Sequence, residues 1–287
     1  MRIGAIFPQT EIGTDPAGLR DWVQAVEQLG YTHVLAYDHV LGADPVVHPG
    51  WDGPYDIDTT FHEPFVLFGF LAALTRLELV TGIVILPQRQ TALVAKQAAE
   101  VDVLTGGRFR LGVGVGWNRV EYDSLGEDFT TRGQRQGEQI ELLRRLWTER
   151  SVTFEGRWDS VAGAGLCPLP VQRPIPIWLG GSTPAAFARA GRLADGWFPM
   201  MQPGPKLDEA RAVVDEAAAG AGRDPADLAM EGRLDVGAID PEELGERLEG
   251  WRATGASHLT FNTMRAGLAS VDDHIAALRR AAEVALG

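Results

Sequence analysis

The sequence has little cysteine, few basic residues and no long apolar run. Cys167 is the sole cysteine among 287 residues, which excludes an intrachain disulfide and a metal site built from several thiolates. Lys and Arg number 26 against 39 Asp and Glu, giving a net charge of −13. Nucleic acid is therefore not an expected partner, because binding phosphates needs clustered cations.

Membrane and export signals are also missing from the sequence. No run approaches the roughly 18 apolar residues of a membrane span. The apolar start of the chain ends at Phe7, which is too short for the core of a signal peptide. We therefore expect a cytoplasmic protein with no membrane partner.

Strand-like runs alternate with helical runs along the whole chain, whose 45% hydrophobic content is ordinary for a globular protein. The predicted strands cover residues 2–7, 32–40, 77–86, 108–115, 175–181, 195–200, 228–236 (the weakest) and 257–263. The predicted helices cover residues 15–30, 63–75, 91–107, 132–147, 183–193, 206–222, 240–255 and 271–285. Near-continuous apolar strands indicate a parallel sheet covered by helices.

Eight such strand–helix units fit an α/β fold of the (β/α)8 TIM-barrel type better than a doubly wound sheet. We expect a single domain over residues 1–287, with insertions after strands two and four. The first is a loop over residues 42–62 that is rich in Pro, Gly, Asp and aromatics, and the second is a small hairpin over residues 150–174. In such a barrel, functional residues lie just after each strand.

The stretch "RFRLGVGVGWNRVEY" places Gly112, Gly114 and Gly116 at the end of the fourth strand. A dinucleotide fingerprint G-x-G-x-x-G would need a further glycine where Trp117 or Arg119 stands, so that interpretation fails. Two alternatives remain open. The glycines give a flat ligand or a phosphate access to the backbone, or they satisfy packing inside a narrow barrel.

The segment Gly180-Gly181-Ser182-Thr183 lies between a strand and a helix with Pro184 in its first turn. Free amides at a helix start, together with two hydroxyls, are typical of an anion site. The alternative is that Ser182 or Thr183 only caps the helix.

Asp38 and His39 end the second strand, where we expect them to face the barrel mouth. Histidine is the natural proton donor or acceptor near neutral pH, although a loop histidine is often just paired with a neighbouring Asp. In the third strand, Gly82 suggests a bulge or a ligand against the backbone. Arg89, just beyond, either meets an anionic substrate group or is solvated.

No metal site is expected, because the remaining histidines lack ligand spacing: His33, His48, His62, His258 and His274. The sequence also has no G-x-S-x-G, Walker or S-x-x-K motif, so serine hydrolases and NTPases have no support.

Taken together, these motifs resemble the luciferase-like monooxygenase superfamily, and within it the deazaflavin branch that uses coenzyme F420. The similarity lies in "FHEPFVLFGFLAALT", "LELVTGIVILPQRQTALVAKQAAEVDVLTGGRFRLGVGVGWNRVEYDSLG", "RGQRQGEQIELLRRLW" and "IPIWLGGSTPAAFARAGRLADGW", which span residues 61–198. "YDH" and the last helices match more loosely.

The resemblance implies a barrel that holds a flavin or deazaflavin across its C-terminal mouth. His39 would handle a proton, Asp38 would hydrogen-bond the ring, and a cis peptide at Gly82–Ile83 within strand three would bulge against it. The cofactor-binding residues that follow are Asp38, His39, Thr81, Gly82, Ile83, Gly114, Val115, Gly116, Trp117, Gly180, Gly181, Ser182 and Thr183, of which the two glycine-rich turns would hold phosphate.

One departure limits what the resemblance carries over. The sugar-phosphate dehydrogenases of this family have a catalytic glutamate at about the position of Trp117, and an indole is no general acid. Their substrate and mechanism are therefore not transferred. The 42–62 loop is a candidate substrate lid.

The leading hypothesis is an F420-dependent oxidoreductase that transfers a hydride between the cofactor and a small organic substrate, with His39 as the catalytic residue. The alternative is an FMN-dependent monooxygenase that uses reduced flavin and oxygen. A third hypothesis, a barrel that binds cofactor without turnover, is disfavoured because His39 and both turns are present. The family resemblance also raises the expectation of a homodimer.

Overall fold

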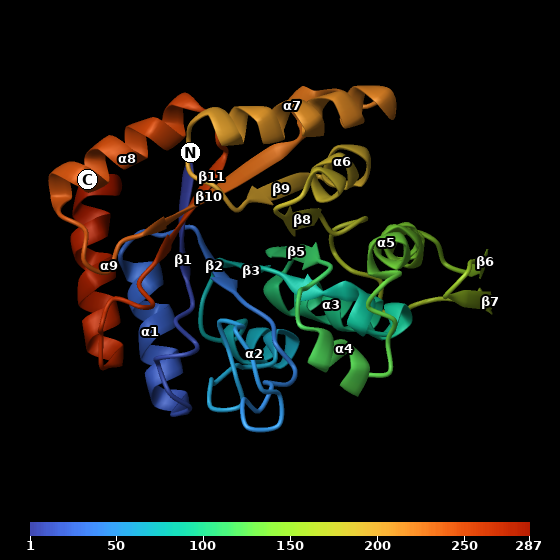
Figure 1. The fold of residues 1–287 in the computed structure, drawn as a ribbon, viewed down its shortest axis with the longest axis horizontal. Coiled ribbons are helices and arrows are strands. Elements are labelled where there is room, and N and C mark those ends of the chain that lie inside the picture. Colours follow the sequence, from blue (N-terminus) through green and yellow to red (C-terminus); the bar gives the residue numbers. More distant parts are fainter.

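In the computed structural model, which describes all 287 residues, eight parallel strands close into a barrel, and one of the eight is interrupted by a bulge (Figure 1). The barrel strands are β1 (Arg2–Ile6), β2 (His33–Ala36), β3 (Glu78–Thr81) with its continuation β4 (Val84–Ile85), β5 (Phe109–Gly114), β8 (Ile177–Gly181), β9 (Gly196–Pro199), β10 (Ala229–Asp235) and β11 (His258–Asn262). Their order is β3-β2-β1-β11-β10-β9-β8-β5, and β5 closes the ring on β3 through the pair Leu79↔Phe109. The predicted (β/α)8 barrel is confirmed.

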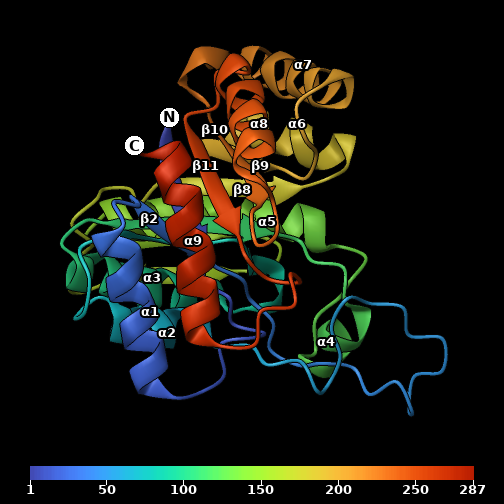
Figure 2. The ribbon, with the colours of Figure 1, turned by 90° about the vertical axis from the view of Figure 1, so that its left-hand side faces the viewer.

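Helices follow the strands and surround the barrel (Figures 1 and 2). They are α1 (Pro16–Gln28), α2 (Pro64–Leu71), α3 (Thr91–Thr105), α4 (Arg119–Ser124), α5 (Arg132–Thr148), α6 (Pro184–Leu193), α7 (Pro205–Gly220), α8 (Pro241–Ala253) and α9 (Val271–Ala285), with short 3-10 turns at Leu86–Gln88 and Pro225–Asp227. Several begin as the sequence indicates, with an acidic cap before a proline: Asp15 accepts a hydrogen bond from the Ala17 amide. No helix combines the length and the apolar character needed to cross a bilayer.

Both predicted insertions are present, and one helix was not predicted. Residues 42–62 form no helix or strand and extend beside α4 (Figure 2). The second insertion carries an antiparallel hairpin, β6 (Val152–Glu155) with β7 (Ser160–Ala164), which projects beyond α5 (Figure 1). The unpredicted helix, α4, is capped by Asn118, whose side chain accepts a hydrogen bond from the Glu121 amide at 3.2 Å. The strand predicted most weakly, β10, has 7 residues and is the longest.

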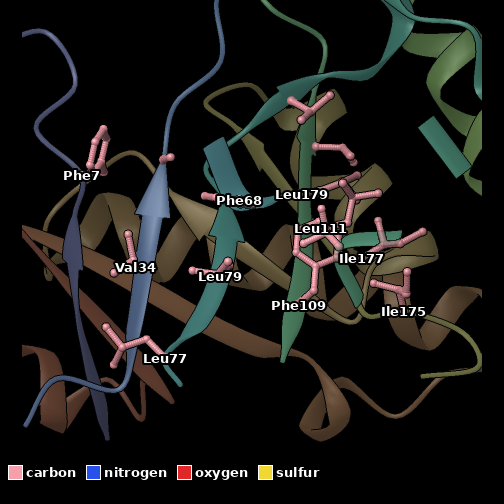
Figure 3. Packing of buried hydrophobic residues seen from close by; sticks show 14 of the residues in the cluster. Phe7, Val34, Phe68, Leu77, Leu79, Phe109, Leu111, Ile175, Ile177 and Leu179 are labelled. Carbon is pink, nitrogen blue, oxygen red and sulfur yellow. The ribbon is translucent and has the colours of Figure 1, made fainter. Parts of the chain in front are cut away.

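The main core lies between the strands and the helices (Figure 3). In β5, Phe109, Leu111 and Val113 belong to this core, while the alternating residues face the barrel interior. A second, smaller apolar cluster lies inside the barrel: Ile6, Leu35, Val80, Trp178, Phe198 and Met264. Each large apolar side chain fully buried in this way contributes about 1.5–3 kcal/mol. This double burial explains the near-continuous apolar runs of the sequence.

Candidate active site

A cavity of about 560 Å³ opens at the carboxyl ends of the barrel strands. Its size falls within the roughly 300–1,000 Å³ of small-molecule sites. The predicted site residues line it, with Thr81 as the sole exception: Asp38, His39, Gly82, Ile83, Gly114, Val115, Gly116, Trp117, Gly180, Gly181, Ser182 and Thr183. Residues separated by more than a hundred positions in the chain therefore share one chamber, as expected from strands that end on the same face of a barrel.

Thr81 does not reach this cavity. Its side chain is fully buried, and its hydroxyl donates a 2.7 Å hydrogen bond to the Gly112 carbonyl. This bond joins β3 to β5 at the point where β3 ends. Thr81 thus supports the wall of the cavity from behind.

The bulge after β3 has the backbone that the resemblance implied, with a cis peptide between Gly82 and Ile83. The Ile83 side chain packs against two glycines of neighbouring strands. A Cβ added to Gly114 would lie 2.4 Å from Ile83 Cδ1, and one added to Gly180 would lie 3.0 Å from Ile83 Cγ2. Glycine at both positions therefore leaves room for Ile83 beside the cavity.

Packing restricts all three glycines of the run, since an added Cβ on Gly116 would also lie 2.8 Å from Ile85 Cγ2, but only two of the three line the cavity. Gly112 serves packing alone, because a Cβ there would lie 1.9 Å from the Thr81 carbonyl oxygen and the residue does not line the cavity. Gly114 and Gly116 line the cavity, and Gly116 has a φ of +67°, a left-handed conformation that favours glycine. The backbone of this turn is thus open to a ligand.

In the turn that follows β8, one hydroxyl caps the helix and the other is available to an anion. Thr183 caps α6, its hydroxyl accepting a hydrogen bond from the Ala186 amide at 3.3 Å. Ser182 is exposed, makes no side-chain hydrogen bond within the protein and lines the cavity. The turn therefore offers a hydroxyl and the amides of a helix start to one chamber, and such a group of donors suits an anion. Phosphate binding by these two turns remains a prediction.

His39 stands among aromatic rings at the edge of the cavity. Its ring centroid lies 5.2 Å from that of Tyr55, 4.8 Å from Phe61 and 5.6 Å from Trp117, all in edge-on geometry. Tyr55 and Phe61 come from the 42–62 loop, and Trp51 of the same loop packs on Trp117 at 5.6 Å. The loop thus covers His39 on one side, and its role as a substrate lid remains a prediction.

Glu121 is a site residue that the sequence analysis did not identify. One of its carboxylate oxygens lies 3.6 Å from His39 Nδ1 and accepts the Leu41 amide at 3.1 Å, and the other accepts Gln88 Nε2 at 2.9 Å. Burial raises the pKa of this carboxyl, but the hydrogen bonds from the side chains of His39 and Gln88 and from the backbone amides lower the pKa by more, so its net shift is downward. Glu121 is therefore ionised beside His39 at neutral pH.

The signal for Glu121 was present but incomplete. Asn118 followed three residues later by Glu121 is a helix-start pattern related to the capping box. That pattern predicts the start of α4. It does not indicate that the glutamate side chain turns away from its own helix toward a histidine some eighty residues earlier.

Asp38 and Arg89 differ from expectation. Asp38 is buried, and its carboxylate accepts Arg89 Nη2 at 2.8 Å and the Ile85 amide at 3.1 Å. Arg89 also pairs with Glu63 at 2.9 Å, so it is neither solvated nor free for a substrate anion. Both oxygens of Asp38 thus accept a hydrogen bond from the protein, one of which fixes β4 beside the bulge, and Asp38 also lines the cavity. A hydrogen bond from Asp38 to a bound ring remains a prediction.

A buried charged network forms the floor of the cavity. Glu231 accepts Arg110 Nη1 at 2.6 Å and contacts His33 Nε2 at 2.8 Å, and Arg110 lies 4.1 Å from the ring centre of Trp178. Burial alone would raise the pKa of Glu231, but Arg110 and His33 hold it far below its usual range. Sequence reasoning passed over these charges because it weighted residues after the strands, whereas Arg110 and Glu231 lie within strands and face inward.

Comparison with known proteins gives this architecture a family. The model of the luciferase-like monooxygenase family matches residues 2–236. A Mycobacterium tuberculosis protein of unassigned activity is 35% identical over 198 residues, 67% of this chain and 68% of its own length. An F420-dependent glucose-6-phosphate dehydrogenase of Microbacterium testaceum is 31% identical over 224 residues, 75% of this chain and 63% of its own. An FMNH2-dependent dimethylsulfone monooxygenase of Pseudomonas putida is 33% identical over 166 residues, 56% of this chain and 45% of its own.

Solved structures agree on the fold. An F420-dependent secondary alcohol dehydrogenase, seen with an F420–acetone adduct, matches with a TM-score of 0.78 at 18% identity over 99% of this chain and 98% of its own. A monooxygenase from Streptomyces bottropensis matches with a TM-score of 0.76 at 20% identity over 100% and 99%. Relatives of this chain thus include users of both cofactors. The chain belongs to the luciferase-like monooxygenase family.

Proposed function

We propose that this protein is an F420-dependent oxidoreductase that transfers a hydride between the cofactor and a small organic substrate. The observation that carries the proposal is His39. One of its nitrogens faces the ionised Glu121, and the other makes no hydrogen bond within the protein, in a chamber that two glycine-rich turns also line. A histidine with one nitrogen held and the other open is suited to moving a proton.

The residues of the cavity fit a flat ring with a phosphate-bearing chain. Ile83 offers an apolar contact at the bulge, and the turns Gly114–Trp117 and Gly180–Thr183 offer backbone amides and the Ser182 hydroxyl to the phosphate. When bound, a deazaflavin would supply a ring that donates or accepts a hydride, that is, two electrons together with a proton. The chain's own contribution is to orient the ring, to exclude water with the aromatic residues around His39, and to hold or release a proton at His39 Nε2.

Trp117 separates this proposal from a sugar-phosphate dehydrogenase. The indole stands at the cavity edge, 43% exposed, where an acid would be needed to carry over that chemistry. With Glu121 buried behind His39, the histidine is left as the proton-transfer residue. The substrate contacts the aromatic group formed by Trp117 and Tyr55.

FMN-dependent oxygenation is the second candidate, favoured by the identity to the dimethylsulfone monooxygenase. The two candidates are separated by titrating the purified protein with coenzyme F420 and, in parallel, with FMN, following the fluorescence of each cofactor. We expect binding of F420 at micromolar concentration and binding of FMN at least tenfold weaker, about 1.4 kcal/mol. Tighter binding of FMN would reject the proposal in favour of the monooxygenase, and binding of neither would reject both.

A further inference from the structure

A second chamber of about 430 Å³ adjoins the cavity described above. Three residues line both spaces and stand between them: Tyr37, Tyr55 and Arg233. The second chamber is walled by the carboxyl ends of β10 and β11, where Asp235 and Asn262 lie, and by the segment after β1. We refer to it as the side chamber.

The side chamber lies across the barrel from the two glycine-rich turns. The strands follow one another around the closed ring as β3-β2-β1-β11-β10-β9-β8-β5, so β1 stands opposite β8 and β11 stands opposite β5. The turns Gly114–Trp117 and Gly180–Thr183 follow β5 and β8. A cofactor held by these turns therefore has its phosphate end far from the side chamber, and the substrate is the ligand left to enter it.

Two arginines of the side chamber have no carboxylate partner. Arg233 Nη1 donates to the Tyr37 hydroxyl at 3.4 Å and makes no other side-chain hydrogen bond. The Arg265 guanidinium lies 5.6 Å from the centre of the Tyr55 ring. Neither arginine forms an ion pair, although both line the chamber. Because a guanidinium carries five N–H donors, most of the donors of both arginines remain free for a ligand.

The charge of the lining favours an anion with a single charge. Besides Arg233 and Arg265, the side chamber is lined by Asp235 and by Arg247, which pairs with Glu243. One positive charge is thus left in excess. A carboxylate carries one negative charge and matches the planar fork of a guanidinium, whereas a phosphate monoester carries about −2 near neutral pH.

The backbone of Arg265 has a conformation that side chains rarely adopt. Its φ is +64°, and every other residue with a positive φ is a glycine. The Arg265 amide donates to Glu11 Oε1 at 2.7 Å, and Glu11 Oε2 lies 3.4 Å from Nε2 of the buried His274. Strained backbone of this kind persists where the surroundings fix it, and it is common at ligand-binding sites. The Arg265 side chain is thus presented to the side chamber by a fixed turn.

We propose that the side chamber binds a carboxylate of the substrate, which makes the substrate class a small organic acid. This inference rests on the proposed function. Tyr55, which stands between the two spaces, contacts both ends of the arrangement: its ring centre lies 5.2 Å from that of His39 and 5.6 Å from the Arg265 guanidinium. The carboxylate is therefore separated by several bonds from the carbon that reacts beside His39.

The test measures binding of keto acids and their neutral esters by titration calorimetry. The probes are levulinate, 5-oxohexanoate, the methyl ester of each acid, and inorganic phosphate. Arg233→Gln with Arg265→Gln removes both unpaired charges, and Arg233→Lys with Arg265→Lys keeps them. Arg252→Gln removes an exposed arginine of α8 that lines neither space, and it is the matched control. The midpoint of urea unfolding shows that each variant is folded.

We expect the wild type to bind at least one of the two acids at millimolar concentration or below, and to bind its ester at least tenfold more weakly, because the ester has no charge. The glutamine variant should lose at least tenfold in affinity for the acid and bind the ester within about twofold of wild type. The lysine variant should stay within about threefold for the acid, and Arg252→Gln should match wild type.

Equal affinity for acid and ester, acid binding unchanged in the glutamine variant, or binding of neither acid would overturn the carboxylate site. Tighter binding of phosphate than of either acid, lost in the glutamine variant, would also overturn it, in favour of a substrate that carries phosphate. The proposed function has its own readout, the titration of the same wild-type protein with F420. Failure of F420 to bind, with acid binding retained, would overturn the proposed function and leave the carboxylate site standing.

Discussion

The protein has two histidine–glutamate pairs, one in the floor of the cavity and one at the mouth of the barrel. In the floor, His33 Nε2 and Glu231 are 2.8 Å apart, and in the mouth, His39 Nδ1 and Glu121 are 3.6 Å apart. Both glutamates are buried, and the pKa of each is lowered from its usual value. The pairs differ in what surrounds the histidine.

The floor pair is satisfied on every side. The other nitrogen of His33 contacts the Thr32 hydroxyl at 2.9 Å, and Glu231 is also held by Arg110 and Thr260. At the mouth, His39 keeps one nitrogen free and stands among aromatic rings at a cavity. The same two residue types thus serve the fold where all their hydrogen bonds are filled, and they serve chemistry where one is left open.

Replacing His39 should give the largest change in activity. We expect His39→Ala to reduce turnover by about 10²–10⁴-fold, since it removes the proton-transfer group, while the affinity for F420 changes by less than about threefold. Turnover is measured from the absorbance of the cofactor, with a small organic substrate first identified by screening, and cofactor affinity is measured by fluorescence titration. His48→Ala, in the loop but outside the cavity, is the matched control. Equal losses of turnover and of cofactor affinity in His39→Ala would assign His39 to binding alone.

Breaking the floor pair should instead change stability. Glu231→Gln leaves Arg110 without its closest counter-charge, and removing one partner of a buried pair costs about 3–5 kcal/mol. Urea unfolding measures this free energy. Glu249→Gln removes an exposed glutamate that pairs with Arg252 and should cost no more than about 1 kcal/mol. A loss below about 1 kcal/mol for Glu231→Gln would show that the floor network does not support the barrel.

The floor should also make the protein sensitive to acid. Burial, followed by the nearby Arg110, lowers the pKa of His258 to about 3. Because the unfolded histidine titrates near 6.5, the unfolded state takes up a proton first as the pH falls, and stability is lost between about pH 6.5 and pH 3. We expect His258→Asn to reduce the loss between pH 7 and pH 4.5 by about 2 kcal/mol. Urea unfolding at both pH values measures it, and an unchanged loss would contradict the assignment.

The smallest effect should come from Glu121. Glu121→Gln keeps the shape of the side chain and removes the charge beside His39, so we expect turnover to fall by about tenfold, or 1.4 kcal/mol. Nitrogen NMR of the His39 ring should show a proton held at Nδ1 in the wild type and a mixture of tautomers in the variant. A purely structural role for Glu121 would leave the tautomer unchanged.

The fold was largely predictable, because strand and helix periods are local properties of the chain. Strands buried on both faces gave continuous apolar runs, and caps such as Asp15 marked helix starts. The positions of His39 and of both glycine turns at one cavity followed from the fold itself. What remained out of reach were side-chain partners across the barrel. Nothing near Glu121 in the sequence indicates His39, and nothing near Asp38 indicates that Arg89 takes up its carboxylate.

Thr81 and the charged residues of the cavity floor show that the direction of a strand side chain could not be predicted from the sequence either. The sequence marks a residue as lying on a strand, but the direction of its side chain depends on register and on the closure of the ring. Thr81 bonds to Gly112 across β3 and β5, away from the cavity. Arg110 on β5 and Glu231 on β10 meet inside the barrel although β8 and β9 lie between their strands, and the curvature of the sheet that brings them together cannot be seen in the sequence.

A crystal structure of the protein with bound coenzyme F420 tests the central claim most directly. The account predicts the phosphate within hydrogen-bonding distance of backbone amides in Gly114–Trp117 and Gly180–Thr183, the ring against Ile83, and His39 Nε2 facing the reacting side. A cofactor bound outside this cavity, or within it but with the phosphate away from both turns, would contradict the account.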